Sequence, residues 1–530
     1  MSRPKFITAA EAAQLVKDGD TLGTVGFVMS GHPDELSYEL EKRFKETGHP
    51  RDLTLTWLAS NSNNRDRIGT ARFAMEGFVK RVIGGHWGLT PEFGTMAIEN
   101  KIEAYNIPQG VLCHVWRAKG GNKPGIITHV GLGTFADPRE DGCKLNELTK
   151  EKGEDLVELI TIDGKEYLLY KTYPINVAFI RGTTADENGN ITMEKEGIFL
   201  EANILAYATK ASGGIVIAQV ENIAKAGTLN PQLVKVPGVV VDYVVQCSDP
   251  QKFHIQSTVS YYDPSLSGEI KVPLNAVKPI PLDERKVICR RAAMELIPNA
   301  NVNLGIGMPE GVGAVAAEEG ISDQMIMTVE PGPIGGVPCS GQQFGMAVNA
   351  EAIMDHPYQF DFYDGGGLDL AVLGLAEVDQ YGNINVSKFG PRIAGAGGFI
   401  NITQNAKSVI FAGTLTASGL KVEVKDGKLN IVQEGKVKKF IPEVGHKTFS
   451  GEYARKKGQK VLYITERAVF EMRPEGLTLT EIAPGIDLET QVLPYIDFEV
   501  KVAPDLKLMD ERIFKDEPMG IKDEILAKAR

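Results

Sequence analysis

The stretch INVAFIRGTTADENGNIT, residues 175–192, is matched without a gap by LDLAVLGLAEVDQYGNIN, residues 368–385, at an offset of 193 positions (368 minus 175). Each copy is an apolar run, typical of a buried strand, that ends in Asp-x-x-Gly-Asn-Ile. The same offset places residues 214–218 over residues 407–411, a second β-branched run in each copy. Two matches at one offset predict an internal repeat.

The beginnings of the two halves share the order helix, strand and glycine loop. The capping-box sequence Thr8-Ala9-Ala10-Glu11 predicts a helix that ends near Gly19, followed by a short strand and a glycine turn at residues 23–27. Residues 281–284 likewise open a helix through about Ile297, and a strand at residues 302–304 then enters a second glycine loop.

The alternation of Val/Ile/Leu-rich runs with helical segments predicts an α/β protein with two tandem domains and largely parallel sheets. Prolines between the halves disfavour continuous helix or central strand. We therefore predict an N-terminal domain at residues 1–262, a proline-containing linker at 263–282 and a C-terminal domain at 283–530. The alternative is one large, irregular α/β enzyme.

Three runs near the carboxyl end also read as strands, at residues 420–424, 429–432 and 460–464. Turns such as Asp426-Gly427-Lys428 separate them, so we expect a local antiparallel group that decorates the second domain.

The composition is that of an ordinary globular protein, with 43% hydrophobic and 24% charged residues. The 57 basic and 69 acidic residues give a net charge of −12, which opposes association with a polyanion. Nucleic acid is therefore not an expected partner. An anionic small molecule stays open, because glycine-loop amides and a few local cations suffice to bind one.

The five cysteines lie at wide spacings, without a C-x-x-C pair or a neighbouring histidine cluster. This pattern predicts reduced thiols and neither disulfides nor a metal site. The amino terminus lacks the apolar core of a signal peptide, and no apolar run is long enough to span a bilayer. We expect a cytoplasmic protein with no membrane partner.

The strongest candidate for chemistry is Glu330, which stands where the strand-like run at residues 325–329 breaks into Pro331-Gly332-Pro333-Ile334-Gly335-Gly336. Ligands of open α/β sheets collect at the carboxyl ends of parallel strands, where glycines let the main chain approach a substrate. A carboxylate in such a place is suited to covalent or acid–base catalysis. A solvated or paired strand-end glutamate is the competing interpretation.

The loop Gly305-Ile306-Gly307-Met308-Pro309 follows a strand of the same half and predicts a second backbone-amide pocket. It is not a dinucleotide fingerprint, because its third glycine comes one position too late for G-x-G-x-x-G. The chain also lacks a Walker A loop and a G-x-S-x-G elbow, which argues against an NTPase and against a serine hydrolase. A tight strand-to-helix turn explains the loop equally well.

Other candidates are less specific. Gly395-Ala396-Gly397-Gly398-Phe399 offers further backbone donors, or is simply a turn before a helix. Gln109 carries a neutral amide able to orient a carboxylate, and Phe27 and Met29 are pocket candidates by their place in first-half loops. His86 is interpreted as a packed histidine rather than a base.

Taken together, several motifs resemble the family I CoA-transferases, most closely the single-chain propionate/acetate type. The resemblance covers nearly the whole chain. The segments that carry it are GIGMP at 305–309, TVEPGPIGG at 328–336, DGGGLD at 364–369, GAGGFI at 395–400, EIAPGID at 481–487 and LMD at 508–510.

The resemblance implies an α-subunit-like domain fused to a β-subunit-like domain, the latter carrying Glu330 as nucleophile. It implies that residues 305–309, Gly397 and Gly398 donate to oxyanions and contact CoA. The implied reaction moves CoA between a short-chain acyl-CoA and a free short-chain carboxylic acid. It is ping-pong through a glutamyl-CoA thioester, with CoA as substrate, no cofactor and a homo-oligomer, by resemblance a homotetramer. The alternatives are an acyl-CoA hydrolase and a non-enzymatic metabolite sensor.

Overall fold

A computed structural model describes residues 3–273 and 279–528, which group into two compact units. Unit 1 comprises Met1–Val272, Val329–Asp361 and Gly390–Asn401; unit 2 comprises Pro273–Thr328, Phe362–Phe389 and Ile402–Arg530. The first boundary falls inside the predicted linker, of which residues 274–278 lie outside the described residues. The compact units are not two continuous halves, because the segment around Glu330 groups with the N-terminal residues.

Unit 1 is built on an eight-stranded sheet in which every pair of neighbouring strands is parallel. Its order is β1 (Lys5–Phe6), β15 (Tyr243–Gln246), β12 (Ile215–Val220), β9 (Val177–Arg181), β2 (Thr21–Thr24), β3 (Leu53–Trp57), β4 (Val79–Gly84) and β5 (Glu103–Asn106). Strands β3 and β9 are buried along their whole length. That burial is why they read as continuous apolar runs rather than alternating ones.

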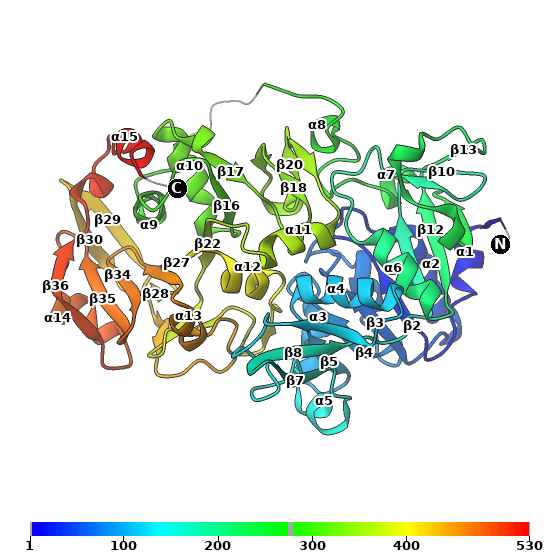
Figure 1. Cartoon of the computed structure of the whole chain (residues 1–530), viewed down its shortest axis with the longest axis horizontal. Helices are drawn as coiled ribbons and strands as arrows, with labels where there is room; N and C mark the ends of the chain where they lie inside the picture. The colour runs from blue at the N-terminus through cyan, green and yellow to red at the C-terminus, as the bar shows by residue number, and fades with distance from the viewer. Residues whose placement is uncertain (1–2, 274–278, 529–530) are drawn as a thin grey trace. The chain divides into compact units, whose positions relative to one another are not determined.

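The helices of unit 1 begin at clear sequence signals. Thr8 and Glu11 form the predicted capping box of α1 (Ala9–Ala13). The helix ends at Ala13, well before the predicted Gly19, because the chain turns to bury Val16 completely. Helices α4 (Gln109–Gly120) and α6 (Ala202–Ala211) pack against each other (Figure 1). Within residues 3–273 and 279–528, no helix has both the length and the apolarity to cross a lipid bilayer.

Unit 2 is built on a second eight-stranded sheet, part parallel and part antiparallel. Its order is β17 (Met325–Met327), β16 (Ala300–Leu304), β22 (Leu370–Gly374), β27 (Ser408–Ala412), β33 (Lys460–Ile464), β34 (Ala468–Arg473), β35 (Gly476–Ile482) and β36 (Lys501–Leu508). The first five strands are parallel, and β34 and β35 then run antiparallel. The α/β fold with large parallel sheets is confirmed.

Two details of unit 2 differ from the sequence predictions. The hairpin of β29 (Lys421–Lys425) and β30 (Lys428–Gln433) forms as expected, but β33 does not join it. Strand β33 pairs in parallel with β27, because its apolar run is buried inside the sheet. Helix α9 (Glu284–Ala293) begins after its Asp283 cap as predicted and ends four residues before Ile297.

The internal repeat is confirmed at the level of single strands. Strands β9 and β12 of unit 1 have counterparts β22 and β27 in unit 2, each beginning 193 positions later. The neighbour order is also the same, β12-β9-β2 in one sheet and β27-β22-β16 in the other. The turn after the repeated strand is closed alike, since Asp186 and Asp379 accept from the N–H of Asn190 and Asn383 at 2.9 and 3.0 Å.

A buried ion pair holds the end of β9. Arg181 and Glu196 are 4% and 3% exposed, and the Arg181 Nε lies 2.9 Å from Glu196 Oε1. The same guanidinium donates to the carbonyl oxygens of His32 and Ile255. Burial opposes ionisation of Glu196, but the charge of Arg181 and hydrogen bonds from Arg181 and His254 outweigh it and lower its pKa from 4.5 to about 2.

We predict that Glu196→Gln lowers the free energy of unfolding by about 3–5 kcal/mol near neutral pH, because it leaves a buried guanidinium without a counter-charge. Since the folded pKa is depressed, the stabilisation is complete above pH 4.5 and is lost as the pH falls toward 2. Denaturant unfolding at several pH values measures the difference from wild type. Glu46→Gln, at an exposed position, is the matched control. A difference that stays constant from pH 7 to pH 3 would contradict the ion-pair account.

Candidate functional site

Glu330 begins a tight turn where the chain leaves β17. The N–H of Val329 donates to the carbonyl of Pro333 at 2.9 Å, and that of Gly332 donates to the carbonyl of Val329 at 3.0 Å. Gly332 has a φ of +136°, and a Cβ at this position would lie 2.1 Å from the carbonyl oxygen of Met354. Only glycine fits there, so the turn that presents Glu330 depends on the glycine-rich sequence after it.

Two neutral donors contact the Glu330 carboxylate. The Gln109 amide Nε2 lies 2.6 Å from Glu330 Oε1, and the backbone N–H of Gly398 also donates to the carboxylate. Gly398 lies so close that a Cβ on it would be 2.6 Å from Glu330 Oε2. The structure thus brings together three residues that the sequence analysis named separately.

The backbone around Gln109 joins the glycine loop to the sheet. Gln109 is the first residue of α4, and its N–H donates to the carbonyl of Gly397 at 2.9 Å. The N–H of Gly397 donates in turn to the carbonyl of Gly85 at 3.0 Å. Gly397 therefore holds the loop in place, while Gly398 contacts the carboxylate.

The surroundings of Glu330 favour its protonated form more than water does. Burial raises the pKa of this carboxyl above 4.5, and His356, the Gln109 amide and the Gly398 N–H oppose that shift without cancelling it. A carboxylate with a raised pKa is more basic and more nucleophilic than one paired with a cation. Carboxyls whose pKa is perturbed by burial cluster at functional sites.

Two residues that the sequence analysis missed complete the surroundings. His356 and Glu201 are 0% and 1% exposed. The Nε2 of His356 lies 3.1 Å from the Gln109 amide nitrogen, and its Nδ1 lies 2.9 Å from Glu201 Oε2. Neither residue belongs to a recognisable motif, and they are 155 positions apart in the chain, so no local pattern signals the pair.

The aromatic pocket candidate Phe27 lies beside this network. Its ring is 6.4 Å from the His356 ring in an edge-on arrangement and 5.8 Å from the ring of Phe344. Met29 is 2% exposed and packs against Gly69, where a Cβ would lie 3.0 Å from its sulfur. The part of each in a substrate pocket stays a prediction.

His86 is partly buried, and its Nδ1 lies 3.0 Å from the hydroxyl of Ser60. Burial lowers its pKa to about 4, with a smaller contribution from Arg392, so the ring is neutral near pH 7.

Within residues 3–273 and 279–528, no three His, Cys, Asp or Glu side chains are grouped so as to hold a metal ion.

The loop Gly305-Ile306-Gly307-Met308-Pro309 follows β16 and belongs to unit 2. Gly307 has a φ of +83°, and its carbonyl accepts from Arg285 Nη2 at 2.8 Å. Ile306 is 59% exposed at the tip. The loop thus presents backbone groups at the end of a parallel strand, and its role as an amide pocket stays a prediction.

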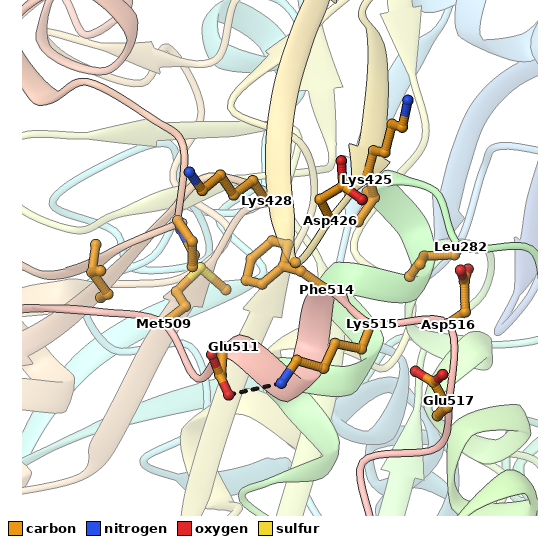
Figure 2. A pocket seen from close by; sticks show the side chains of 14 residues that line it. Leu282, Lys425, Asp426, Lys428, Met509, Glu511, Phe514, Lys515, Asp516 and Glu517 are labelled. Atoms are coloured by element: carbon orange, nitrogen blue, oxygen red, sulfur yellow. Dashed lines mark hydrogen bonds and ion pairs between the residues drawn. The ribbon is translucent and has the colours of Figure 1, made fainter.

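A separate pocket of about 640 Å³ lies wholly within unit 2 (Figure 2). None of the predicted site residues lines it. Its charged lining is mixed, and the ammonium of Lys515 is paired with Glu511 at 2.7 Å. The charged residues are Lys425, Asp426, Lys428, Glu511, Lys515, Asp516 and Glu517. This near balance of charge gives the pocket no clear preference for an anion.

Comparison with known proteins gives one consistent result. The family model for coenzyme A transferase matches residues 6–247. A caffeate CoA-transferase from Acetobacterium woodii is 47% identical over 529 residues, covering 99% of this chain and 100% of the relative. The acetate CoA-transferase YdiF from Escherichia coli K12 is 46% identical over 521 residues, covering 98% and 96%.

A solved structure agrees with these sequence matches. The acyl-CoA transferase YdiF of E. coli O157:H7, in a thioester complex with CoA, superposes with a TM-score of 0.91 at 45% identity, covering 98% of this chain and 97% of that one. The chain belongs to the coenzyme A transferase family. It is an enzyme that transfers CoA between an acyl-CoA and a carboxylate, as the family resemblance of its motifs implied.

We predict that Gly398→Ala lowers kcat/KM for CoA transfer about 100-fold or more. The added methyl group would lie 2.6 Å from Glu330 Oε2 and must displace the carboxylate, and misplacement by about 1 Å costs on this order. Steady-state transfer assays measure the effect. Gly445→Ala is the matched control, because a Cβ there meets nothing within 4 Å. Equal activity of both variants would mean that the contact with Gly398 is not needed.

Proposed function

We propose that this enzyme exchanges CoA between a short-chain acyl-CoA, such as acetyl-, propionyl- or butyryl-CoA, and a free short-chain carboxylic acid. Glu330 is the nucleophile, and the reaction is ping-pong through a glutamyl-CoA thioester. The observation that carries the proposal is the contact of a partly buried carboxylate of raised pKa with two neutral donors, Gln109 and Gly398.

The first half-reaction has two steps. A carboxylate oxygen of Glu330 attacks the thioester carbonyl of acyl-CoA; the C–S bond breaks, and an acyl-glutamyl anhydride and CoA thiolate form. The thiolate then attacks the glutamyl carbonyl carbon, and the original acyl group leaves as its carboxylate. The enzyme now holds a glutamyl-CoA thioester. No proton is gained or lost overall.

The second half-reaction is the reverse with a different acid. Its carboxylate attacks the glutamyl-CoA carbonyl, which expels CoA thiolate and forms a new mixed anhydride. The thiolate attacks the new acyl carbonyl, and Glu330 leaves as a free carboxylate. No atom changes its oxidation state in these steps, so no redox partner is needed. We propose that CoA acts as substrate without a further cofactor.

Each step passes through a tetrahedral intermediate with charge on oxygen. A positioned backbone donor stabilises such an intermediate by on the order of 3 kcal/mol. The Gly398 N–H and the Gln109 amide contact the Glu330 carboxylate, which supports a role for both as donors to the intermediates on the Glu330 carbonyl. By family resemblance, the loop at residues 305–309 and Gly397 would contact CoA and the intermediates on the substrate side.

The solved relative supports the intermediate, since that protein was captured as a thioester complex with CoA. The related enzymes act on acetate in one case and caffeate in another, and we propose the short-chain range for this chain. We also propose a cytoplasmic homotetramer. Cys143, Cys247, Cys289 and Cys339 are free thiols, which fits a reducing compartment. Light scattering tests the tetramer.

We predict that brief exposure to propionyl-CoA without an acceptor acid adds one CoA to Glu330. Intact-protein and peptide mass spectrometry measure the adduct, and hydroxylamine or borohydride trapping tests its thioester nature. Glu330→Asp should reduce transfer at least about 100-fold, because the shorter side chain withdraws the oxygen from its donors.

The control for this experiment is Glu351→Gln, an exposed glutamate of the same segment, which should still acquire CoA on Glu330. Rapid release of free CoA without an adduct would support a hydrolase instead. Undiminished transfer by Glu330→Asp would refute the assignment of the nucleophile.

A further inference from the structure

A continuous chain of polar contacts runs from the Glu330 carboxylate to a buried acid. Glu330 Oε1 lies 2.6 Å from Gln109 Nε2, which lies 3.1 Å from His356 Nε2. His356 Nδ1 lies 2.9 Å from Glu201 Oε2. Gln109, His356 and Glu201 are 0%, 0% and 1% exposed. These three side chains are therefore closed to bulk solvent.

The direction of each hydrogen bond follows from the contact with Glu201. With Glu201 Oε2 as the acceptor, His356 Nδ1 donates and carries the ring proton. His356 Nε2 faces the Gln109 amide nitrogen, which only donates, so Nε2 must accept. An amide NH2 carries two hydrogens, enough for both His356 and Glu330, whereas the amide oxygen of Gln109 would repel the carboxylate. Only one orientation of the Gln109 amide places a donor toward both His356 and Glu330.

We propose that Glu201 and His356 are positioning residues for CoA transfer, which act through Gln109 by holding its NH2 toward Glu330. This inference rests on the proposed role of Glu330 as nucleophile. Neither residue touches the reacting atoms; each determines how the next residue is oriented.

The backbone at Glu201 indicates that this arrangement has a cost in stability. The preceding residue, Leu200, has a φ of +58°, a left-handed conformation that is strained for a non-glycine residue. Its carbonyl accepts from the N–H of His356 at 3.0 Å. The His356 ring also stacks on Phe360, with centroids 5.3 Å apart and planes 29° apart. The Leu200 carbonyl and the Phe360 ring thus hold the imidazole at hydrogen-bonding distance from Gln109 and Glu201.

The orientation of Gln109 has a cost at its amide oxygen. This buried atom has no hydrogen-bond partner among the described residues, and it faces the position of Gly397 at 3.8 Å from where a Cβ would stand. An unsatisfied buried acceptor is costly. The amide keeps this orientation nevertheless, because a rotated amide would leave both Glu330 and His356 facing an oxygen.

The test begins with Glu201→Gln, which is nearly isosteric. An amide at this position is able to donate to Nδ1 of His356, which moves the imidazole proton to Nε2 and turns the Gln109 oxygen toward Glu330. We expect the rate of glutamyl-CoA formation to fall roughly 10- to 100-fold. The acid limb of the pH–rate profile should also move to higher pH, because the carboxylate has lost its donor. Glu46→Gln is the control, and thermal unfolding checks the fold.

A double-mutant cycle separates positioning from general damage. If Glu201 acts through Gln109, then in the Gln109→Ala background the change Glu201→Gln should alter the rate less than about twofold. Equal fold-losses in both backgrounds would overturn the proposal. So would a Glu201→Gln enzyme with wild-type rate and pH profile.

The tautomer of His356 is measurable without any activity. In ¹⁵N-histidine-labelled protein, with His356 assigned by its loss in His356→Gln, we expect the proton on Nδ1 in the wild type and on Nε2 in Glu201→Gln. A wild-type ring protonated on Nε2 near neutral pH overturns the positioning role. A missing CoA adduct on Glu330 overturns the proposed function instead, and the spectrum still decides the arrangement of Glu201, His356 and Gln109.

Discussion

The site depends on one constraint: neutral hydrogen-bond donors must hold the Glu330 carboxylate in place. Its partners are the Gln109 amide and the Gly398 N–H, both neutral. The same unit contains the opposite case, in which Arg181 lowers the pKa of Glu196 to about 2. An acid stabilised to that degree is a structural ion-pair partner and a poor nucleophile. Neutral donors fix the position of Glu330 while leaving its pKa raised, which suits the nucleophilic role proposed for it.

Much of the surrounding backbone follows from this constraint. A neutral donor acts only at hydrogen-bonding distance, so Gly398 must approach until no Cβ fits beside the carboxylate. The turn after Glu330 must be equally tight, which requires Gly332 against Met354. An amide side chain, unlike a backbone N–H, is free to rotate by half a turn and present the wrong atom. Gln109 therefore needs neighbours that hold it, and His356 and Glu201 occupy that place.

The sequence predicted the features that depend on neighbouring residues or on a repeated pattern. The repeat predicted which strands correspond, and the capping residues Thr8 and Asp283 predicted where helices begin. Glu330, Gln109 and the glycine loop were named because glycine and strand-end patterns are local. The pairing of β33 with β27 was missed, because an apolar run encodes burial and not the identity of its neighbour. His356 and Glu201 were missed because they lie far apart in the chain and only the folded structure brings them into contact.

The repeat also distinguishes the strands and turns that both units share from the side chains that only one unit has. The strands and the Asp186 and Asp379 turns occur in both units, but the charged residues around the first-unit strands do not. At the same offset, Arg181, Glu196 and Glu201 correspond to Gly374, Phe389 and Ala394. A repeated sheet supplies two sets of strand ends, and the set in unit 1 carries this polar network. The residues that contact Glu330 accordingly come from unrepeated positions, so the repeat alone predicts the fold but never the site.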